Sequence, residues 1–126
     1  MTNERVLRLL MTHANSHGLK VGSNDQLKWR GAYYPGLKRV ELRHLNEASD
    51  SISVLAHEIG HHYDYLKCKR AFYGSRSLKT ALRLERVAWS NARRTLEWLG
   101  FEDWAVFGAL RRRSLRAVIR YRLGTE

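Results

Sequence analysis

Two histidines and a glutamate stand close together in the run His57-Glu58-Ile59-Gly60-His61. If this run is helical, residues four apart lie one above the other, so both imidazoles can reach one metal ion about 2.0–2.1 Å away. Glu58 is rotated by about 100° from His57 and lies beside such an ion, where its carboxylate can accept a proton from an activated water. The spacing therefore predicts a zinc-dependent hydrolytic site with His57 and His61 as ligands and Glu58 as general base.

A catalytic zinc site takes three protein ligands and leaves one position for water, so a third ligand has to come from elsewhere in the chain. Glu85 falls on the apolar stripe of the next predicted helix, three residues after Leu82 and three before Ala88. A carboxylate that faces a core is costly unless it is paired or coordinated. We therefore predict that Glu85 is the third zinc ligand, and the alternative is an ion pair between Glu85 and Arg86 or Arg93.

Other acidic residues compete for the third ligand position. Asp64 lies on the same face as the two histidines but one turn further along, which suits an acceptor behind a ligand better than a ligand. Glu97 is rotated by about 120° from Glu85, and Glu102 and Asp103 fall in a predicted turn. Three residues beside the motif are candidates for binding an oxyanion, and the sequence does not choose among them: His62, Tyr63 and Tyr65.

The first elements that must position these residues can be predicted from periodicity. Residues 3–16 carry apolar side chains at helical spacing, with Thr2 or Asn3 as the capping residue. Polar and apolar residues alternate on both sides of Pro35-Gly36, which predicts an antiparallel hairpin of about 27–34 with 37–44. A two-residue loop would place Gly31 opposite Val40 and Trp29 opposite Leu42.

Three more helices are predicted after the hairpin, at about 51–67, 77–99 and 103–123. The first carries the histidine motif, and the second carries Glu85 and ends before Gly100. The third would kink, because Arg111 and Arg122 otherwise join its apolar face. We expect one α+β domain over 1–126, in which the motif helix packs against the Glu85 helix. Gly60 removes a side chain from the motif helix at a point where another backbone could approach.

Positive charge is concentrated in the second half of the chain. The 126 residues carry a net charge of +11, and residues 66–126 hold 15 basic against 5 acidic residues. Six arginines of the basic C-terminal segment follow one another without an intervening acid: Arg111, Arg112, Arg113, Arg116, Arg120 and Arg122. This pattern favours an anionic partner, either nucleic acid or an acidic protein face, or else a solvated helix surface.

The composition predicts a cytoplasmic protein without a membrane span. No apolar run approaches 18 residues, and polar Asn3 and Glu4 stand where a signal peptide would need an apolar core. The single cysteine, Cys68, cannot form an internal disulfide, which favours a reducing compartment.

The motifs resemble those of the gluzincin metallopeptidases, and most closely those of the small ImmA/IrrE-type peptidases of bacteria, phages and mobile elements. The resemblance covers about 29–99 and depends on A-H-E-I-G-H at 56–61 and E-R-V-A-W at 85–89. It implies zinc ligands at His57, His61 and Glu85 and a general base at Glu58. A metzincin would have glycine at 64 and histidine at 67, where this chain has aspartate and lysine, so that class is excluded.

The leading functional hypothesis is a zinc metalloendopeptidase that acts on a protein or peptide substrate. The alternative is a basic module that binds nucleic acid or another protein, in which the zinc site is structural or vestigial. The sequence alone leaves the substrate and the oligomeric state open.

Overall fold

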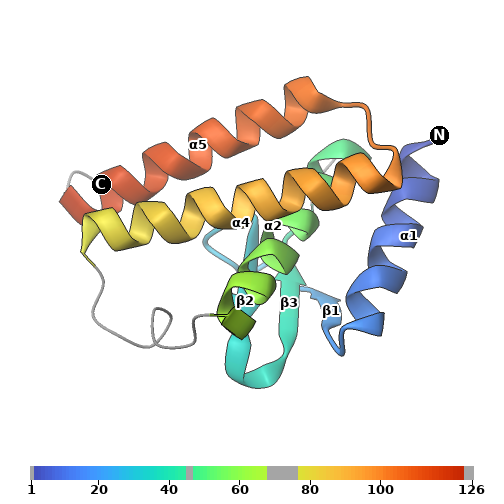
Figure 1. Ribbon diagram of the computed structural model, residues 1–126, viewed down its shortest axis with the longest axis horizontal. Coiled ribbons are helices and arrows are strands. Elements are labelled where there is room, and N and C mark those ends of the chain that lie inside the picture. Colours follow the sequence, from blue (N-terminus) through green and yellow to red (C-terminus); the bar gives the residue numbers. More distant parts are fainter. Residues whose placement is uncertain (1, 45–46, 68–76, 124–126) are drawn as a thin grey trace.

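The computed structural model describes residues 2–44, 47–67 and 77–123 of the chain. Its elements form an α+β fold, with four helices and a three-stranded sheet, as the sequence predicts. Helices α4 (Leu78–Leu99) and α5 (Trp104–Leu123) lie along one side of the molecule, and the sheet lies on the other (Figure 1). None of the described helices combines the length and the apolar character that crossing a membrane requires.

The predicted N-terminal helix is confirmed as α1 (Asn3–Ser16). The side chain of Thr2 accepts a hydrogen bond from the backbone N–H of Arg5, which satisfies one of the free donors at the helix start. Val6, Leu10 and Ala14 lie four residues apart and are all buried. This stripe faces α2 (Ala48–Lys67), the helix that carries the histidine motif.

The sheet is mixed rather than purely antiparallel. Strands β2 (Gly31–Tyr34) and β3 (Arg39–Leu42) form the predicted antiparallel pair, and β1 (Lys20–Ser23) pairs with β3 in parallel. The strand order is β1-β3-β2, so β2 lies at an edge. The sequence analysis missed β1, because it is only four residues long and its partner is distant in the chain.

The predicted hairpin register is wrong by two residues. Gly31 pairs with Leu42 and Tyr33 with Val40, because the loop has four residues instead of two. Residues 35–37 form a 3-10 turn, and Lys38 follows with φ of 47°, in the left-handed region. An L-proline turn splays the strands of a two-residue hairpin, whereas a longer loop restores their twist. A shift of two residues leaves each side chain on its predicted face of the sheet.

Helix α2 is central to the fold, since it contacts the other three helices as well as β2 and β3. It begins at Ala48, three residues before the predicted start, and 12 of its 20 residues are buried. The buried set includes polar side chains of the motif, His57 and Glu58. Because the helix is covered on most sides, these polar side chains are buried instead of facing solvent.

The two long C-terminal helices follow the prediction closely. Ser77 caps α4 by accepting a hydrogen bond from the N–H of Thr80, and Gly100 ends the helix with φ of 82°. Helix α5 runs without a break from Trp104 to Leu123, so the expected kink does not interrupt the helix. Arg111, which was expected to disturb the apolar face of this helix, is half-buried and lines a groove with Arg93 and Trp104. Cys68 and the side chain of Arg122 lie outside the described residues.

Candidate metal centre

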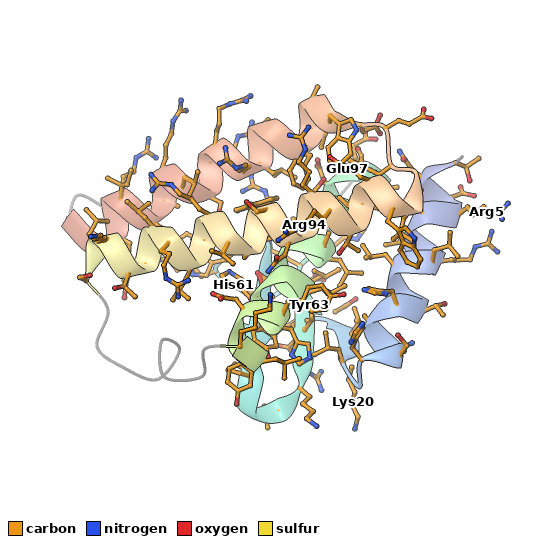
Figure 2. The ribbon with its side chains drawn as sticks, in the orientation of Figure 1. Arg5, Lys20, His61, Tyr63, Arg94 and Glu97 are labelled. Atoms are coloured by element: carbon orange, nitrogen blue, oxygen red, sulfur yellow. The ribbon has the colours of Figure 1, made fainter. Side chains whose placement is uncertain are left out.

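The structure brings Glu85 of α4 against both histidines of the α2 motif. The Nε2 atom of His57 lies 2.9 Å from Glu85 Oε2, and the Nε2 atom of His61 lies 2.8 Å from Glu85 Oε1. Each carboxylate oxygen therefore contacts one imidazole. In Figure 2, His61 lies at the part of α2 that runs beneath α4.

The close approach of α2 and α4 depends on Gly60. A Cβ atom at this position would lie only 2.1 Å from the backbone oxygen of Ala88 in α4. The backbone oxygen of Gly60 also accepts a hydrogen bond of 3.1 Å from the side chain of Asn91. Gly60 lies between the motif histidines, and Ala88 lies about one turn after Glu85. The contact of Gly60 with Ala88 therefore sets the distance between the histidines and Glu85.

The site is largely withdrawn from water. His57 is 8% exposed and Glu58 is 5% exposed. Burial alone would lower the pKa of His57, but the carboxylates of Glu85 and Glu58 outweigh it and raise this pKa to about 10. Burial would likewise raise the pKa of Glu85, but His57 and His61 lower it well below its usual range. Both pKa shifts have the same cause, which is the attraction between imidazole rings and carboxylates that face one another in a site with little water.

Glu58 contacts the ring nitrogen of His57 that does not face Glu85. The Oε1 atom of Glu58 lies 3.1 Å from His57 Nδ1, whereas Nε2 of the same ring faces Glu85. This contact fixes the orientation of the ring and leaves Nε2 directed at the site. The ligand atoms of His57, Glu58 and His61 lie within 4.8 Å of one another, so these three residues could hold a metal ion.

Two further residues hold the centre in place, and the sequence analysis assigned neither of them a role in the site. The hydroxyl of Ser114 on α5 donates a hydrogen bond of 2.6 Å to Glu85 Oε2. The Trp89 indole stacks on the His57 ring, with centroids 4.2 Å apart and an angle of 14° between the planes. Ser114 stands four residues from Leu110 and from Val118, so a small polar residue on an apolar stripe was the available signal.

The rivals for the third ligand position lie elsewhere in the structure. Glu97 forms an ion pair with Arg93 at 2.9 Å, and Asp103 accepts a hydrogen bond from the side chain of Asn3. Glu102 is exposed at the start of the turn. Asp64 is buried, and its Oδ1 atom lies 3.8 Å from Arg83 Nη1. The alternative for Glu85 was an ion pair with Arg86 or Arg93, and the described residues do not form it. The side-chain partners of Glu85 are the two motif histidines and Ser114.

The three candidates for binding an oxyanion have contacts elsewhere in the structure. His62 Nδ1 shares a hydrogen bond of 2.7 Å with the hydroxyl of Tyr33. Tyr63 is hydrogen-bonded to His13 of α1, on the side of α2 that Figure 2 shows facing that helix. The Tyr65 ring lies against Tyr33, with centroids 6.2 Å apart. None of the three lines the cavity described next.

A cavity of about 580 Å³ opens onto the centre. Its wall is formed by the residues before β2, by α2, by α4 and by α5. Its volume lies within the range of about 300–1,000 Å³ that small-molecule sites occupy. The lining includes His57, Glu58, His61 and Glu85 together with Ser114, so the candidate site residues share one accessible space.

Comparison with protein-family models, with curated proteins and with solved structures finds no match to this chain. Two imidazole nitrogens and a partly buried carboxylate are ligand types that zinc binds. Ligands of one zinc ion lie about 3.0–3.5 Å apart, since each is about 2.0–2.1 Å from the metal. The contacts of 2.8 and 2.9 Å at Glu85 are close to that spacing, so the residues present fit the ion.

Proposed function

We propose that this chain is a zinc-dependent peptidase of the gluzincin type. The observation that carries the proposal is the contact of one Glu85 carboxylate with both motif histidines, at 2.9 and 2.8 Å, in the wall of a cavity. His57, His61 and Glu85 would hold the ion through Nε2 of each ring and the carboxylate. A bound zinc ion would supply Lewis acidity at the scissile carbonyl and an activated water.

Glu58 is the general base in this proposal. It lines the cavity beside the proposed ligands and is itself nearly buried, so its carboxylate acts in a medium where water competes weakly. It accepts a proton from the attacking water and delivers that proton to the leaving amine nitrogen. The contact of 3.1 Å with His57 Nδ1 holds the carboxylate in place between these steps.

Strand β2 offers a place for the substrate backbone. Its other edge has no neighbouring strand among the described residues, and Gly31 at its start lines the cavity. A peptide in extended conformation could hydrogen-bond along this edge as an additional strand. Such binding would align the scissile bond with Glu58, because α2 packs directly against β2.

The test separates metal binding from hydrolysis through Glu58→Gln. The glutamine oxygen can still accept a hydrogen bond from His57, so this variant should retain zinc, measured by native mass spectrometry. Its cleavage of a random mixture of fluorescence-quenched peptides should fall at least about 100-fold, the scale of a lost general base. Glu97→Gln, on the exposed surface of α4, is the matched control and should cleave like the wild type.

Two results would overturn the proposal. One is equal cleavage by the wild type and Glu58→Gln. The other is zinc binding that survives Glu85→Ala unchanged, because loss of a ligand should cost more than the roughly 10- to 100-fold that loss of an outer contact costs.

A second candidate function, nucleic-acid binding, is favoured by one row of α5. Arg112, Arg116 and Arg120 follow one another at four-residue spacing and are all exposed, so they form a stripe that could follow phosphates. Binding of duplex DNA that weakens steeply with salt, and that Arg112→Ala with Arg116→Ala reduces, would support this function. Absent or salt-independent binding would reject it.

A further inference from the structure

Basic side chains line the same cavity as the metal centre. Lys28 and Arg30 come from the segment before β2, and Arg113 comes from α5. The acidic residues of the lining are Glu58 and Glu85, which the proposed mechanism already uses. Three positive charges from two distant parts of the chain therefore face the space in which a substrate would lie.

Three arginines outside the cavity lie within ion-pair distance of an acidic side chain, unlike the two arginines that line the cavity. Arg39 binds Glu41, Arg83 approaches Asp64 and Arg93 binds Glu97. Within residues 2–44, 47–67 and 77–123, neither Arg30 nor Arg113 forms an ion pair. Their charges are thus available to an anionic group that enters from solvent.

Lys28 joins the two walls at the mouth of the cavity. Its Nζ atom lies 5.0 Å from the ring centroid of Trp29 and 5.8 Å from that of Tyr121, so it contacts aromatic rings from both sides. Both aromatic residues line the cavity and are substantially exposed, at 45% and 61%. The mouth therefore combines flat apolar surfaces with positive charge.

We propose that the substrates are polypeptide segments with an aspartate or glutamate side chain beside the scissile bond, bound by Arg30 and Arg113. This inference rests on the proposed peptidase function. A guanidinium matches a carboxylate with two parallel hydrogen bonds, which makes arginine the better side chain for this recognition. The arginines and Glu58 line one cavity, so an acidic side chain held there keeps the neighbouring backbone near the metal centre.

A peptide fits the cavity better than a nucleic acid does. The cavity holds the proposed zinc ligands and lies beside the open edge of β2, which suits an extended backbone with main-chain hydrogen bonds. The exposed row of Arg112, Arg116 and Arg120 is outside the cavity lining. A nucleic acid would therefore be expected at that row, and binding of an oligonucleotide distinguishes the two partners.

The experiment measures binding to zinc-loaded Glu58→Gln, which should not cleave its ligand. Three labelled peptides of one length are compared by fluorescence anisotropy: an amide-capped peptide with Asp and Glu, its amide-capped Asn and Gln counterpart, and the counterpart with a free terminal carboxylate. A single-stranded oligonucleotide of the same charge is the fourth probe. The same probes are applied after adding Arg30→Gln, Arg113→Gln or the control Arg5→Gln, since Figure 2 shows Arg5 on α1, at the far side of the molecule.

We expect the capped acidic peptide to bind most tightly, and each cavity substitution to weaken it by about fivefold to tenfold. Arg5→Gln should leave binding unchanged. Arg113→Glu, at an exposed position, should reverse the preference in favour of a lysine-containing peptide. Equal binding of the acidic and amide peptides would overturn the inference. So would tightest binding of the free terminal carboxylate or of the oligonucleotide, or equal weakening by Arg5→Gln.

Failure of the inference and failure of the function give different results. If the wild type cleaves acidic and amide peptides with equal kcat/KM, the peptidase stands and the acidic preference is wrong. If the acidic peptide binds through Arg30 and Arg113 but is never cleaved by the zinc-loaded wild type, the peptidase is wrong and the carboxylate-binding cavity stands.

Discussion

Glu85 occupies its position through contacts from two other helices. His57 and His61 of α2 approach its two oxygens, and Ser114 of α5 donates to one of them. A partly buried carboxylate with this many partners is held in one orientation, which lowers the cost of ordering it around an ion. At the scale of single residues, the protein's own contacts therefore orient the carboxylate of the proposed ligand.

Ser114→Ala should weaken zinc binding by roughly 10- to 100-fold, because the hydroxyl orients the carboxylate from behind. Competition with a fluorescent zinc chelator would measure this affinity. The matched control is Ser90→Ala, at an exposed position of α4. If both variants bind zinc like the wild type, Ser114 does not support the ligand.

At the scale of elements, the closeness of α2 and α4 brings the ligands together. Gly60→Ala would place a methyl group 2.1 Å from the Ala88 backbone oxygen, which cannot rotate away. The helices would have to separate, and we expect a loss of about 1–3 kcal/mol or more in the free energy of unfolding, measured in urea. Zinc affinity should fall as well, because separation of the helices moves Glu85 from the histidines.

Gly108→Ala is the control for that substitution. Gly108 is also helical, but a Cβ atom there would meet only the flexible end of the Arg112 side chain, at 3.3 Å. Replacing a glycine inside a helix should then stabilise the protein by about 0.5–1 kcal/mol. Equal effects at both positions would contradict the role of Gly60 as the contact point of the helices.

The contact between α1 and α2 should be sensitive to acid. Burial, together with the neighbouring His17, lowers the pKa of His13 from its ordinary 6.5, and this ring is hydrogen-bonded to Tyr63. A histidine with a lowered pKa favours the folded state while neutral, so its contribution is present above about pH 6.5 and is lost as the pH falls through the lowered value.

The Tm of the wild type should therefore decrease from pH 7.5 to pH 5 more than the Tm of His13→Gln does, in thermal unfolding followed by circular dichroism. His44→Gln is the control, because His44 is exposed. Identical pH dependence in the wild type and His13→Gln would show that this ring does not couple to folding.

At the scale of the whole molecule, the proposed ligands join α2, the most connected helix, to the layer of α4 and α5. Zinc at 100 times its Kd should stabilise the fold by about 2.7 kcal/mol and raise the Tm by roughly 10 °C. Addition of a chelator should reverse the shift, and Glu85→Ala should not show it. An unchanged Tm in the wild type would mean that zinc does not bind the folded chain at this site.

The distribution of charge also becomes clear only at this scale. The sequence concentrates positive charge in its second half, but α5 divides its arginines between two directions. Arg113 lines the cavity, whereas Arg112, Arg116 and Arg120 form the exposed row. A single basic segment can thus serve two different anionic groups.

Local features were predictable from the sequence, because they depend on residues close together in the chain. Thr2, Ser77 and Gly100 mark helix ends through their own hydrogen bonds and dihedral angles. The spacing of His57 and His61 places both rings on one helix face wherever that helix packs. Glu85 on an apolar stripe indicated a carboxylate with a buried partner.

The tertiary structure decided which distant residues meet. The pairing of β1 with β3 and the register of the hairpin depend on loop geometry and on hydrogen bonds between distant residues. The alternation of polar and apolar residues does not fix the register, because a shift of two residues leaves each side chain on the same face of the sheet. Ser114 reaches Glu85 and Arg113 reaches the cavity only because α5 folds back along α4 (Figure 1). Helical periodicity predicts which face of each helix is buried. The angle at which two helices cross depends instead on how their side chains fill the shared core.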